Sequence, residues 1–173
     1  MVSDTTQSGP TTEVLLELRN LHVRFGAQYV LRNINLSVPR GQTLAVIGES
    51  GCGKSVLLKT MIGLIRPTQG EVIFDNHNLA ELTERQLTLE RVRYGFVFQN
   101  AALFDSLTIG QNVAFPVRQH KPSWQSELEQ LVLTRLAEVG LPATVAPKKP
   151  AELSGGMRKR VGLARALMLD PEI

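Results

Sequence analysis

A glycine-rich octapeptide, GESGCGKS, occupies residues 48–55 and fits the spacing G-x-x-x-x-G-K-[ST]. Its glycines allow the backbone to curl so that N–H groups point inward at phosphate oxygens, and a helix that begins there adds partial positive charge. We expect Lys54 to reach the β- and γ-phosphates and the Ser55 hydroxyl to hold Mg²⁺. The motif therefore predicts a site for ATP and Mg²⁺, and the alternative is a strand-to-helix turn without a ligand. The residues expected to contact the nucleotide here are Gly48, Glu49, Ser50, Gly51, Cys52, Gly53, Lys54, Ser55 and Val56.

Cys52, the sole cysteine of the sequence, lies inside this octapeptide and two residues before Lys54. A thiol at the start of a helix and beside a cation is expected to be reactive. We therefore predict that a thiol reagent blocks nucleotide binding and that bound ATP with Mg²⁺ protects the cysteine. The alternative is that Cys52 is a small residue without a regulatory role.

The segments around the octapeptide alternate between strand and helix patterns. TLAVIG at 43–48 is a continuous apolar run, typical of a strand buried on both faces of a parallel sheet, and YGFVFQ at 94–99 is predicted as another strand. Apolar periodicity predicts further strands over residues 14–25, 34–38 and 71–75, and helices over residues 54–64 and 79–91. This order predicts an α/β fold in which a buried strand leads directly into the phosphate loop.

Residues 100–160 have a different character, with helix patterns in place of strands. Ser123 is expected to cap a helix over 124–140 that ends at Gly140. The residues that this helix places on one side are Leu128, Val132, Leu136 and Val139. We expect a flexible tail over residues 1–13 and a partial nucleotide-binding domain over 14–173. That domain would comprise a β-rich core with the phosphate loop (14–99) and a helical subdomain (100–160).

Composition narrows the function classes. With 43% hydrophobic and 20% charged residues over 173 positions, the chain has the composition of one soluble globular domain. No apolar stretch approaches the roughly 18 residues of a membrane span, and the N-terminus lacks the apolar core of a secretory signal. A net charge of +3 and an aromatic content of 5% do not indicate a nucleic-acid surface. We therefore expect a cytoplasmic protein without a nucleic-acid partner.

A second candidate anion site lies in LSGGM, residues 153–157. Ser154 can cap the helix that follows, while Gly155 and Gly156 leave N–H groups exposed for contact with an anion. By itself, Ser-Gly-Gly can equally be an ordinary helix start. The apolar residues that recur at helical spacing beyond it and are expected to face the core are Met157, Val161, Ala164 and Met168.

Together these motifs resemble those of the ATP-binding cassette (ABC) ATPases, from about Leu15 onward. LSGGM is similar to the family signature LSGGQ, with Met157 in place of the glutamine, and RVGLARAL resembles the helix that follows it. Gln99 matches the Q-loop glutamine, and Phe25 matches the aromatic residue that stacks on adenine. The resemblance implies a P-loop NTPase fold: an α/β core with a mixed or parallel sheet, flanking helices and a helical insertion subdomain.

The resemblance also implies roles for these residues. Lys54 and Gln99 are the implied catalytic residues, with Gln99 sensing the γ-phosphate and contacting Mg²⁺ together with Ser55. Two ATP-binding subunits of this family pair head to tail as a homodimer, so that Ser154 and the two glycines after it complete the ATP site of the partner. ATP then favours the closed dimer, and hydrolysis lets the pair open.

Residues 100–120, NAALFDSLTIGQNVAFPVRQH, together with LSGGMRKR, are similar to the ATPases of Mla-type phospholipid-transport or toluene-resistance systems. This resemblance implies a transmembrane permease as partner, an MCE-domain lipid-binding protein working with it, and a peripheral location on the inner face of the cell (inner) membrane. The transported solute would be a phospholipid or another apolar compound. Residues that could form the permease-docking groove, or equally belong to the core, are Leu103, Phe104, Leu107, Val113 and Phe115.

ABC ATPases also use a Mg²⁺-orienting aspartate after a strand, a glutamate that positions water, and a later histidine. The sequence ends at DPEI, residues 170–173, before these residues would come. Asp170 precedes a proline and is expected in a helix-to-strand turn, with the Mg²⁺-orienting aspartate as the alternative. We therefore expect a fragment of a longer protein whose sheet is incomplete at its C-terminal edge, with weak ATP binding and no meaningful hydrolysis.

Two other functions are kept as alternatives to an ABC transporter subunit. One is a soluble ABC-type ATPase that acts on nucleic acid or the ribosome, and the other is a non-hydrolysing nucleotide-binding remnant that regulates an intact subunit. Proteins of the first kind usually carry two cassettes or a long insertion with extended basic surfaces, which this sequence does not show. The densest basic run, Lys148 and Lys149 with residues 158–160, is most simply a solvated face.

Overall fold

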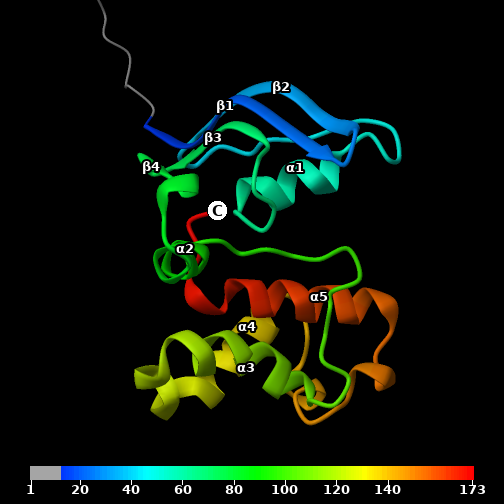
Figure 1. Cartoon of the computed structure of the whole chain (residues 1–173). Helices are drawn as coiled ribbons and strands as arrows, with labels where there is room; N and C mark the ends of the chain where they lie inside the picture. The colour runs from blue at the N-terminus through cyan, green and yellow to red at the C-terminus, as the bar shows by residue number, and fades with distance from the viewer. Residues whose placement is uncertain (1–12) are drawn as a thin grey trace, which may run out of the picture. The chain divides into compact units, whose positions relative to one another are not determined.

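The computed structural model describes residues 13–173, and the chain divides into two compact units, residues 1–87 and residues 88–173 (Figure 1). Unit 1 carries the sheet and the glycine-rich loop, and unit 2 carries the helices that end in the LSGGM helix. The predicted flexible tail over 1–13 lies, apart from Glu13, outside the described residues.

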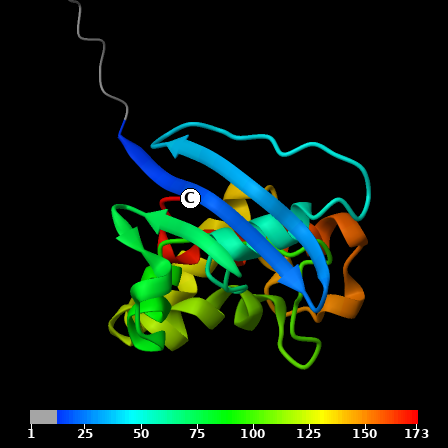
Figure 2. The same ribbon diagram turned by 45° about the horizontal axis from the view of Figure 1, so that its top comes forward.

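An antiparallel sheet of four strands, in the order β2-β1-β3-β4, forms unit 1 (Figure 2). The strands are β1 (Val14–Phe25), β2 (Gln28–Pro39), β3 (Gln69–Phe74) and β4 (His77–Asn78). The strands predicted over 14–25, 34–38 and 71–75 are confirmed, the second beginning earlier at Gln28. Strand β1 lies between β2 and β3 and pairs with both.

A bulge in β1 keeps its apolar side chains on one face. Leu18 is 2% exposed, two exposed residues follow, and Leu21 is again fully buried at 0%. The alternation changes phase because the pairing register shifts at this point and Asn20 adopts a φ of 46°. Gly70 lies opposite, where a Cβ atom would approach the Asn20 carbonyl oxygen to 2.2 Å, so that only glycine fits.

Helix α1 (Lys54–Met61) lies under this sheet and begins directly after the glycine-rich loop (Figures 1 and 2). It buries Leu57 and ends three residues before the predicted end at 64, where Gly63 takes a φ of 69°. The helix predicted over 79–91 is interrupted. It consists of a 3₁₀ turn, η1 (Leu79–Glu81), and helix α2 (Glu84–Arg91).

The strands predicted over 43–48 and 94–99 do not form. Both segments are irregular, and Ile47 is 92% exposed. A strand of a parallel sheet needs hydrogen-bonded neighbours on both sides and apolar cover on both faces. The described sheet offers these segments neither, because all its pairings are antiparallel and none includes them. The prediction of these strands from apolar composition was therefore wrong for this chain.

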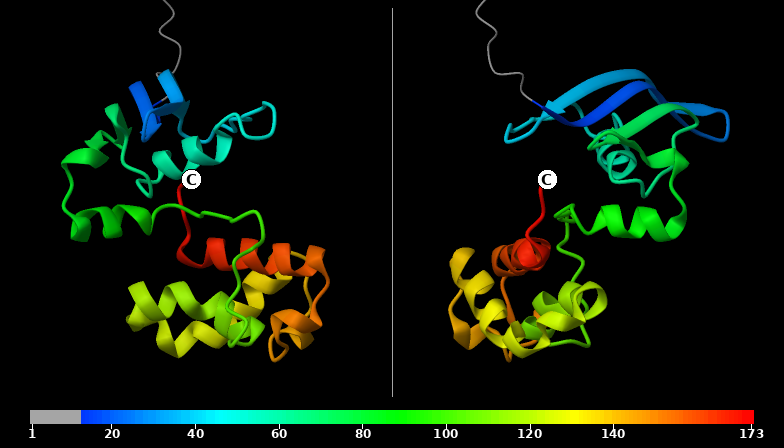
Figure 3. Two further views of the ribbon diagram at one scale, coloured as in Figure 1. Left: turned by 45° about the vertical axis from the view of Figure 1, so that its right-hand side comes forward. Right: turned by 90° about the vertical axis from the view of Figure 1, so that its left-hand side faces the viewer.

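Unit 2 is built from three helices, α3 (Ile109–His120), α4 (Leu128–Glu138) and α5 (Gly155–Ala166) (Figure 3). Short 3₁₀ turns lie between them, η2 (Pro122–Glu127), η3 (Ala143–Val145) and η4 (Pro150–Glu152), and a further one, η5 (Leu167–Leu169), follows α5. The side chains of their shared core that are 0% exposed are Ile109, Val113, Val117, Leu136, Val161, Ala164 and Met168. The stripe predicted for the last helix is confirmed, with Met157 half-buried at its edge.

The helix predicted over 124–140 is shorter than expected. Residues 122–127 form the 3₁₀ turn η2, and α4 starts at Leu128 without a side-chain cap, so the prediction that Ser123 caps the helix was wrong. Gly140 follows the helix with a φ of 69°, as expected of a residue that ends it. None of the described helices is long and apolar enough to cross a bilayer.

Candidate functional site

The glycine-rich loop leads from β2 into α1, and its shape depends on glycines at defined positions. Gly51 and Gly53 have φ values of 82° and 100°, a region that favours glycine. Gly53 is the residue before α1, and a Cβ atom there would lie 3.1 Å from side-chain atoms of both Val30 and Leu31. At Gly48 a Cβ atom would lie 2.8 Å from the Cys52 Sγ atom, so the two ends of the loop face each other closely.

Lys54 turns its ammonium group back into this loop. Its Nζ atom donates to the Gly48 carbonyl oxygen at 2.7 Å and to the Glu49 carbonyl oxygen at 2.5 Å, and lies 3.6 Å from the Cys52 Sγ atom. An ammonium group has three donors and no acceptor, so all its hydrogen-bonding capacity is directed at loop atoms. The arrangement gathers a cation within a curled backbone, which is a chemistry suited to phosphate oxygens.

The remaining predicted contact residues of the loop are open to solvent. Glu49, Ser50 and Cys52 are exposed, as is Ser55 on the first turn of α1, whereas Val56 is half-buried. The Ser55 hydroxyl is therefore accessible at a helix N-terminus, where the aligned peptide dipoles favour anions. The structure thus brings all nine predicted residues from 48 to 56 onto one loop and helix start.

Phe25 lies at the end of β1, opposite Gln28 in the hairpin, and is 52% exposed. An exposed ring at this place is available for stacking on a base.

The same hairpin carries a cluster that sequence reasoning missed. Arg24 and Arg32 place their guanidinium carbons 5.7 Å and 5.0 Å from the Tyr29 ring centroid. The sequence signal for this cluster is an aromatic residue with arginines near it in two predicted adjacent strands.

Gln99 lies in unit 2, exposed, at the start of a tight turn. The Ala101 N–H donates to the Phe98 carbonyl oxygen at 2.9 Å, and the Ala102 N–H donates to the Asn100 carbonyl oxygen at 2.7 Å. Both alanines have positive φ values, 60° and 46°. The predicted site residues are thus divided between the units, with Phe25 and residues 48–56 in unit 1 and Gln99 and residues 154–156 in unit 2.

The LSGGM segment forms a capped helix start. The Ser154 hydroxyl accepts from the Met157 N–H at 3.3 Å, which confirms the predicted cap. Gly155 and Gly156 are exposed, and nothing lies within 4 Å of the position that a Cβ atom would take on Gly156. Behind them, Arg158 donates to the Leu153 carbonyl oxygen at 2.6 Å and fixes the turn. The backbone of both glycines is therefore accessible to a ligand.

Comparison with known proteins shows the family of this chain. The family model described as ABC transporter matches residues 31–173. The chain belongs to the ABC transporter family. The predicted α/β fold of P-loop NTPase type is confirmed by its solved relatives.

Individual relatives make the likeness more specific. The probable ribonucleotide transport ATP-binding protein mkl of Mycobacterium tuberculosis is 43% identical over 160 residues, covering 92% of this chain and 44% of mkl. The intermembrane phospholipid transport system ATP-binding protein MlaF of Haemophilus influenzae is 42% identical over 159 residues, covering 92% of this chain and 60% of MlaF. This ABC chain therefore spans about half the length of the curated relatives it matches.

A solved relative is the ATP-binding cassette MJ0796, described as a dimer in a post-hydrolysis state bound to ADP and Pi. It superimposes with a TM-score of 0.83 at 35% sequence identity, covering 91% of this chain and 71% of that one. The described sheet of the ABC chain, with four strands, is open at its edges.

Several charged residues of the ABC chain have structural roles. The guanidinium of Arg160 donates to the Gly140 carbonyl oxygen at 2.8 Å, and the Lys149 Nζ atom donates to the Ser106 carbonyl oxygen at 2.7 Å. Asp170 has left-handed backbone angles at the end of η5 and pairs with Arg135, so it lies at a helix end as predicted, but residues 171–173 do not form the expected strand. Much of the basic run is therefore occupied with backbone carbonyls within unit 2.

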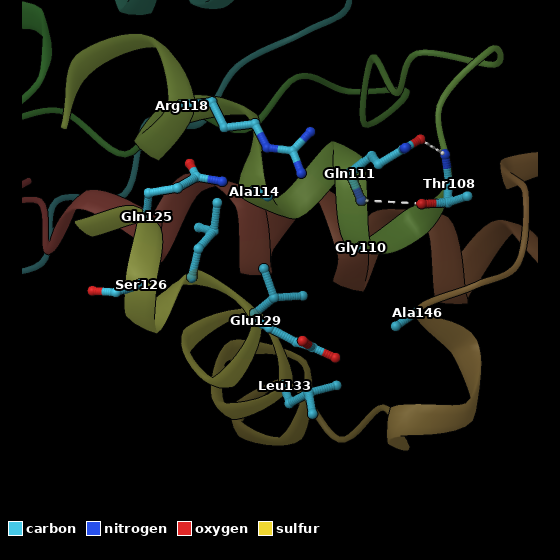
Figure 4. Close-up of a pocket in the computed structure, with 12 residues that line it drawn as sticks. Thr108, Gly110, Gln111, Ala114, Arg118, Gln125, Ser126, Glu129, Leu133 and Ala146 are labelled. Atoms are coloured by element: carbon cyan, nitrogen blue, oxygen red, sulfur yellow. Dashed lines mark hydrogen bonds between the residues drawn. The ribbon is translucent and has the colours of Figure 1, made fainter. Parts of the chain in front are cut away.

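Unit 2 also has two hollows. A groove of about 550 Å³ runs past the Gln99 turn and is lined by aromatic side chains, among them Phe98, Phe104 and Phe115. A second hollow of about 450 Å³ lies between α3 and α4, where Arg118 and Glu129 project into it and the Thr108–Gln111 capping box forms its rim (Figure 4). None of the predicted nucleotide or metal ligands lines either hollow.

Proposed function

We propose that the chain binds ATP with Mg²⁺ through residues 48–56, with Lys54 on the β- and γ-phosphates and Ser55 on the metal. The observation that carries this proposal is the Lys54 ammonium, which the loop surrounds with the Gly48 and Glu49 carbonyls. Phosphate oxygens are stronger acceptors for this cation than carbonyls are, because they carry charge. When bound, Mg²⁺ neutralises charge on the phosphates, and the Ser55 hydroxyl on α1 supplies an oxygen ligand of the kind it prefers.

We propose for the other site residues the roles that the family resemblance implies. Gln99 senses the γ-phosphate and contacts Mg²⁺, and Phe25 stacks on the adenine. Ser154, Gly155 and Gly156 cap the ATP of a second copy in a head-to-tail homodimer. Support for the last role comes from the exposed glycine backbone at the start of α5 and from the dimeric state described for MJ0796.

We propose that a transmembrane permease docks in the aromatic groove of unit 2. Phe104 is 43% exposed, and its ring lies 4.7 Å from that of Phe115 on α3, so the two form an accessible apolar surface. Of the other residues predicted for docking, Val113 is fully buried and belongs to the core, and Leu103 packs against that core.

The complete protein would then hydrolyse ATP and pass the energy to the permease, moving a phospholipid or another apolar solute. The likeness to MlaF, which is described as part of an intermembrane phospholipid transport system, supports this cargo. An MCE-domain lipid-binding protein would work with the permease, and the chain would lie on the inner face of the cell membrane. Fractionation of cells with and without the permease would test that location, because the protein should leave the membrane fraction when the permease is deleted.

The test of nucleotide binding is substitution of the loop lysine. Lys54→Ala is expected to weaken binding of a fluorescent ATP analogue with Mg²⁺ by about tenfold or more, because a charge-assisted contact is lost. Lys59→Ala is the matched control, since Lys59 is an exposed lysine of the same helix outside the loop. Equal affinities of the wild-type chain and the Lys54→Ala variant would contradict the proposal.

A further inference from the structure

The turn that follows Gln99 holds an unfavourable backbone conformation. Among the described residues, the non-glycine residues with positive φ are Asn20, Asn33, Asp75, Asn76, Ala101, Ala102 and Asp170. Asparagine and aspartate tolerate the left-handed region because their short polar side chains can hydrogen-bond locally, but alanine has no such group. The two alanines must therefore be held in this conformation by their surroundings.

Arg165 on α5 supplies that hold. Its Nη2 atom donates to the Ala101 carbonyl oxygen at 2.6 Å, and its Nη1 atom donates to the Ala102 carbonyl oxygen at 2.8 Å. The guanidinium is a rigid fork, so bonds to two successive carbonyls fix the orientation of both peptide units. Burial lowers the pKa of Arg165, which agrees with a guanidinium partly withdrawn from water.

The helix face beside Arg165 is shaped to receive the same turn. Gly162 lies one turn earlier on α5 and is buried, and a Cβ atom on it would lie 3.0 Å from the Ala101 Cβ atom. Ala101 is only 1% exposed as a result. The turn is thus pressed against a gap in the helix surface and bonded to the residue next to that gap.

We propose that Arg165 is a positioning residue for Gln99. It joins the Gln99 turn to α5, the helix that begins at Ser154, so that Gln99 and the Ser154–Gly156 cap move as one body. Arg165 lies eleven positions after Ser154, roughly 16 Å further along the helix. Because Arg165 also lines the aromatic groove, a partner in that groove contacts the same junction. The inference rests on the proposed role of Gln99 as the sensor of the γ-phosphate.

The test compares two arginines of α5 that both donate to backbone carbonyls. Arg165→Met removes the bonds to the Gln99 turn, and Arg160→Met removes the bond to Gly140, which lies elsewhere. Hydrogen exchange of the amides of residues 98–102 reports the turn. Competition with a fluorescent nucleotide at fixed Mg²⁺ reports the affinities for ATP and ADP. Arg165→Lys is the conservative variant. It keeps the positive charge, but one ammonium can replace only part of the guanidinium fork.

Arg165→Met is expected to speed exchange at residues 98–102 and to reduce the preference for ATP over ADP by about tenfold, with the ADP affinity unchanged. Arg165→Lys should retain part of the preference, and Arg160→Met should retain all of it. An unchanged preference in Arg165→Met, or an equal loss in Arg160→Met, would overturn the inference while leaving nucleotide binding intact. A wild-type chain that binds neither nucleotide would instead refute the proposed function and with it the role of Arg165.

Discussion

The Nζ atom of Lys54 lies 3.6 Å from the Sγ atom of Cys52, inside the loop where the phosphates of a nucleotide are proposed to bind. Cys52 is exposed, so a reagent can reach it, and its sulfur lies 2.8 Å from the position that a Cβ atom would take on Gly48. Any group added to the sulfur must therefore occupy the loop or open it. The thiol and the lysine share one small volume.

Alkylation of Cys52 is expected to abolish nucleotide binding, because the added group displaces the Lys54 ammonium and fills the loop. Saturating ATP with Mg²⁺ should slow modification, as measured by mass spectrometry of the intact chain. A Cys52→Ser variant should bind nucleotide and be insensitive to the reagent. Normal ATP binding by fully alkylated protein would show that the sulfur lies outside the site.

Replacement of Phe25 by alanine is expected to weaken ATP binding by about tenfold, because base stacking on an aromatic ring contributes about 1–3 kcal/mol. Phe25 is 52% exposed at the hairpin, whereas Tyr29 in the adjacent strand already lies under two arginines. Tyr29→Ala is therefore the control and should bind ATP normally in the same titration. The opposite pattern would assign base stacking to Tyr29.

Asn112→Ala is expected to destabilise the chain by about 1–3 kcal/mol, because it removes the side-chain hydrogen bonds of a fully buried residue, including both bonds to the Phe104 backbone. Asn112 is 0% exposed; its Oδ1 atom accepts from the Phe104 N–H at 2.7 Å, and its Nδ2 atom donates to the Phe104 and Thr108 carbonyl oxygens, each at 3.0 Å. Gln119→Ala, at an exposed position of the same helix, should cost little. Urea denaturation of both variants measures the difference, and equal midpoints would refute this role of Asn112.

Alkaline pH is expected to destabilise the chain through Tyr94. Burial raises the pKa of the Tyr94 hydroxyl well above its ordinary value of 10.0. The folded state therefore holds this proton more tightly than the unfolded state, so its stabilising contribution is complete below pH 10 and is lost as the pH rises above it. The slope should reach at most about 1.4 kcal/mol per pH unit. Tyr94→Phe should reduce that slope in denaturation at pH 9 to 11, and an unchanged slope would contradict the assignment.

Features that depend on neighbouring residues were predictable from the sequence, and features that depend on distant partners were not. The glycine-rich loop, the Ser154 cap and the hairpin strand β1 depend on neighbouring residues, whose spacing directly specifies glycine turns, a cap hydroxyl and an alternating face. The strands expected at 43–48 and 94–99 depend instead on partners elsewhere in the chain. Both segments are rich in apolar residues, but no described strand pairs with them, so their backbones are irregular.

Local spacing was enough to predict a glycine-rich turn that holds a lysine, and a capped helix that exposes two glycines, because these features are made from consecutive residues. Only the folded chain shows that Arg165 bonds to carbonyls more than sixty residues earlier, that Arg160 and Lys149 serve backbone oxygens, and that Phe104 meets Phe115 at an open groove. Such contacts join segments that are distant in sequence, and packing between helices decides them.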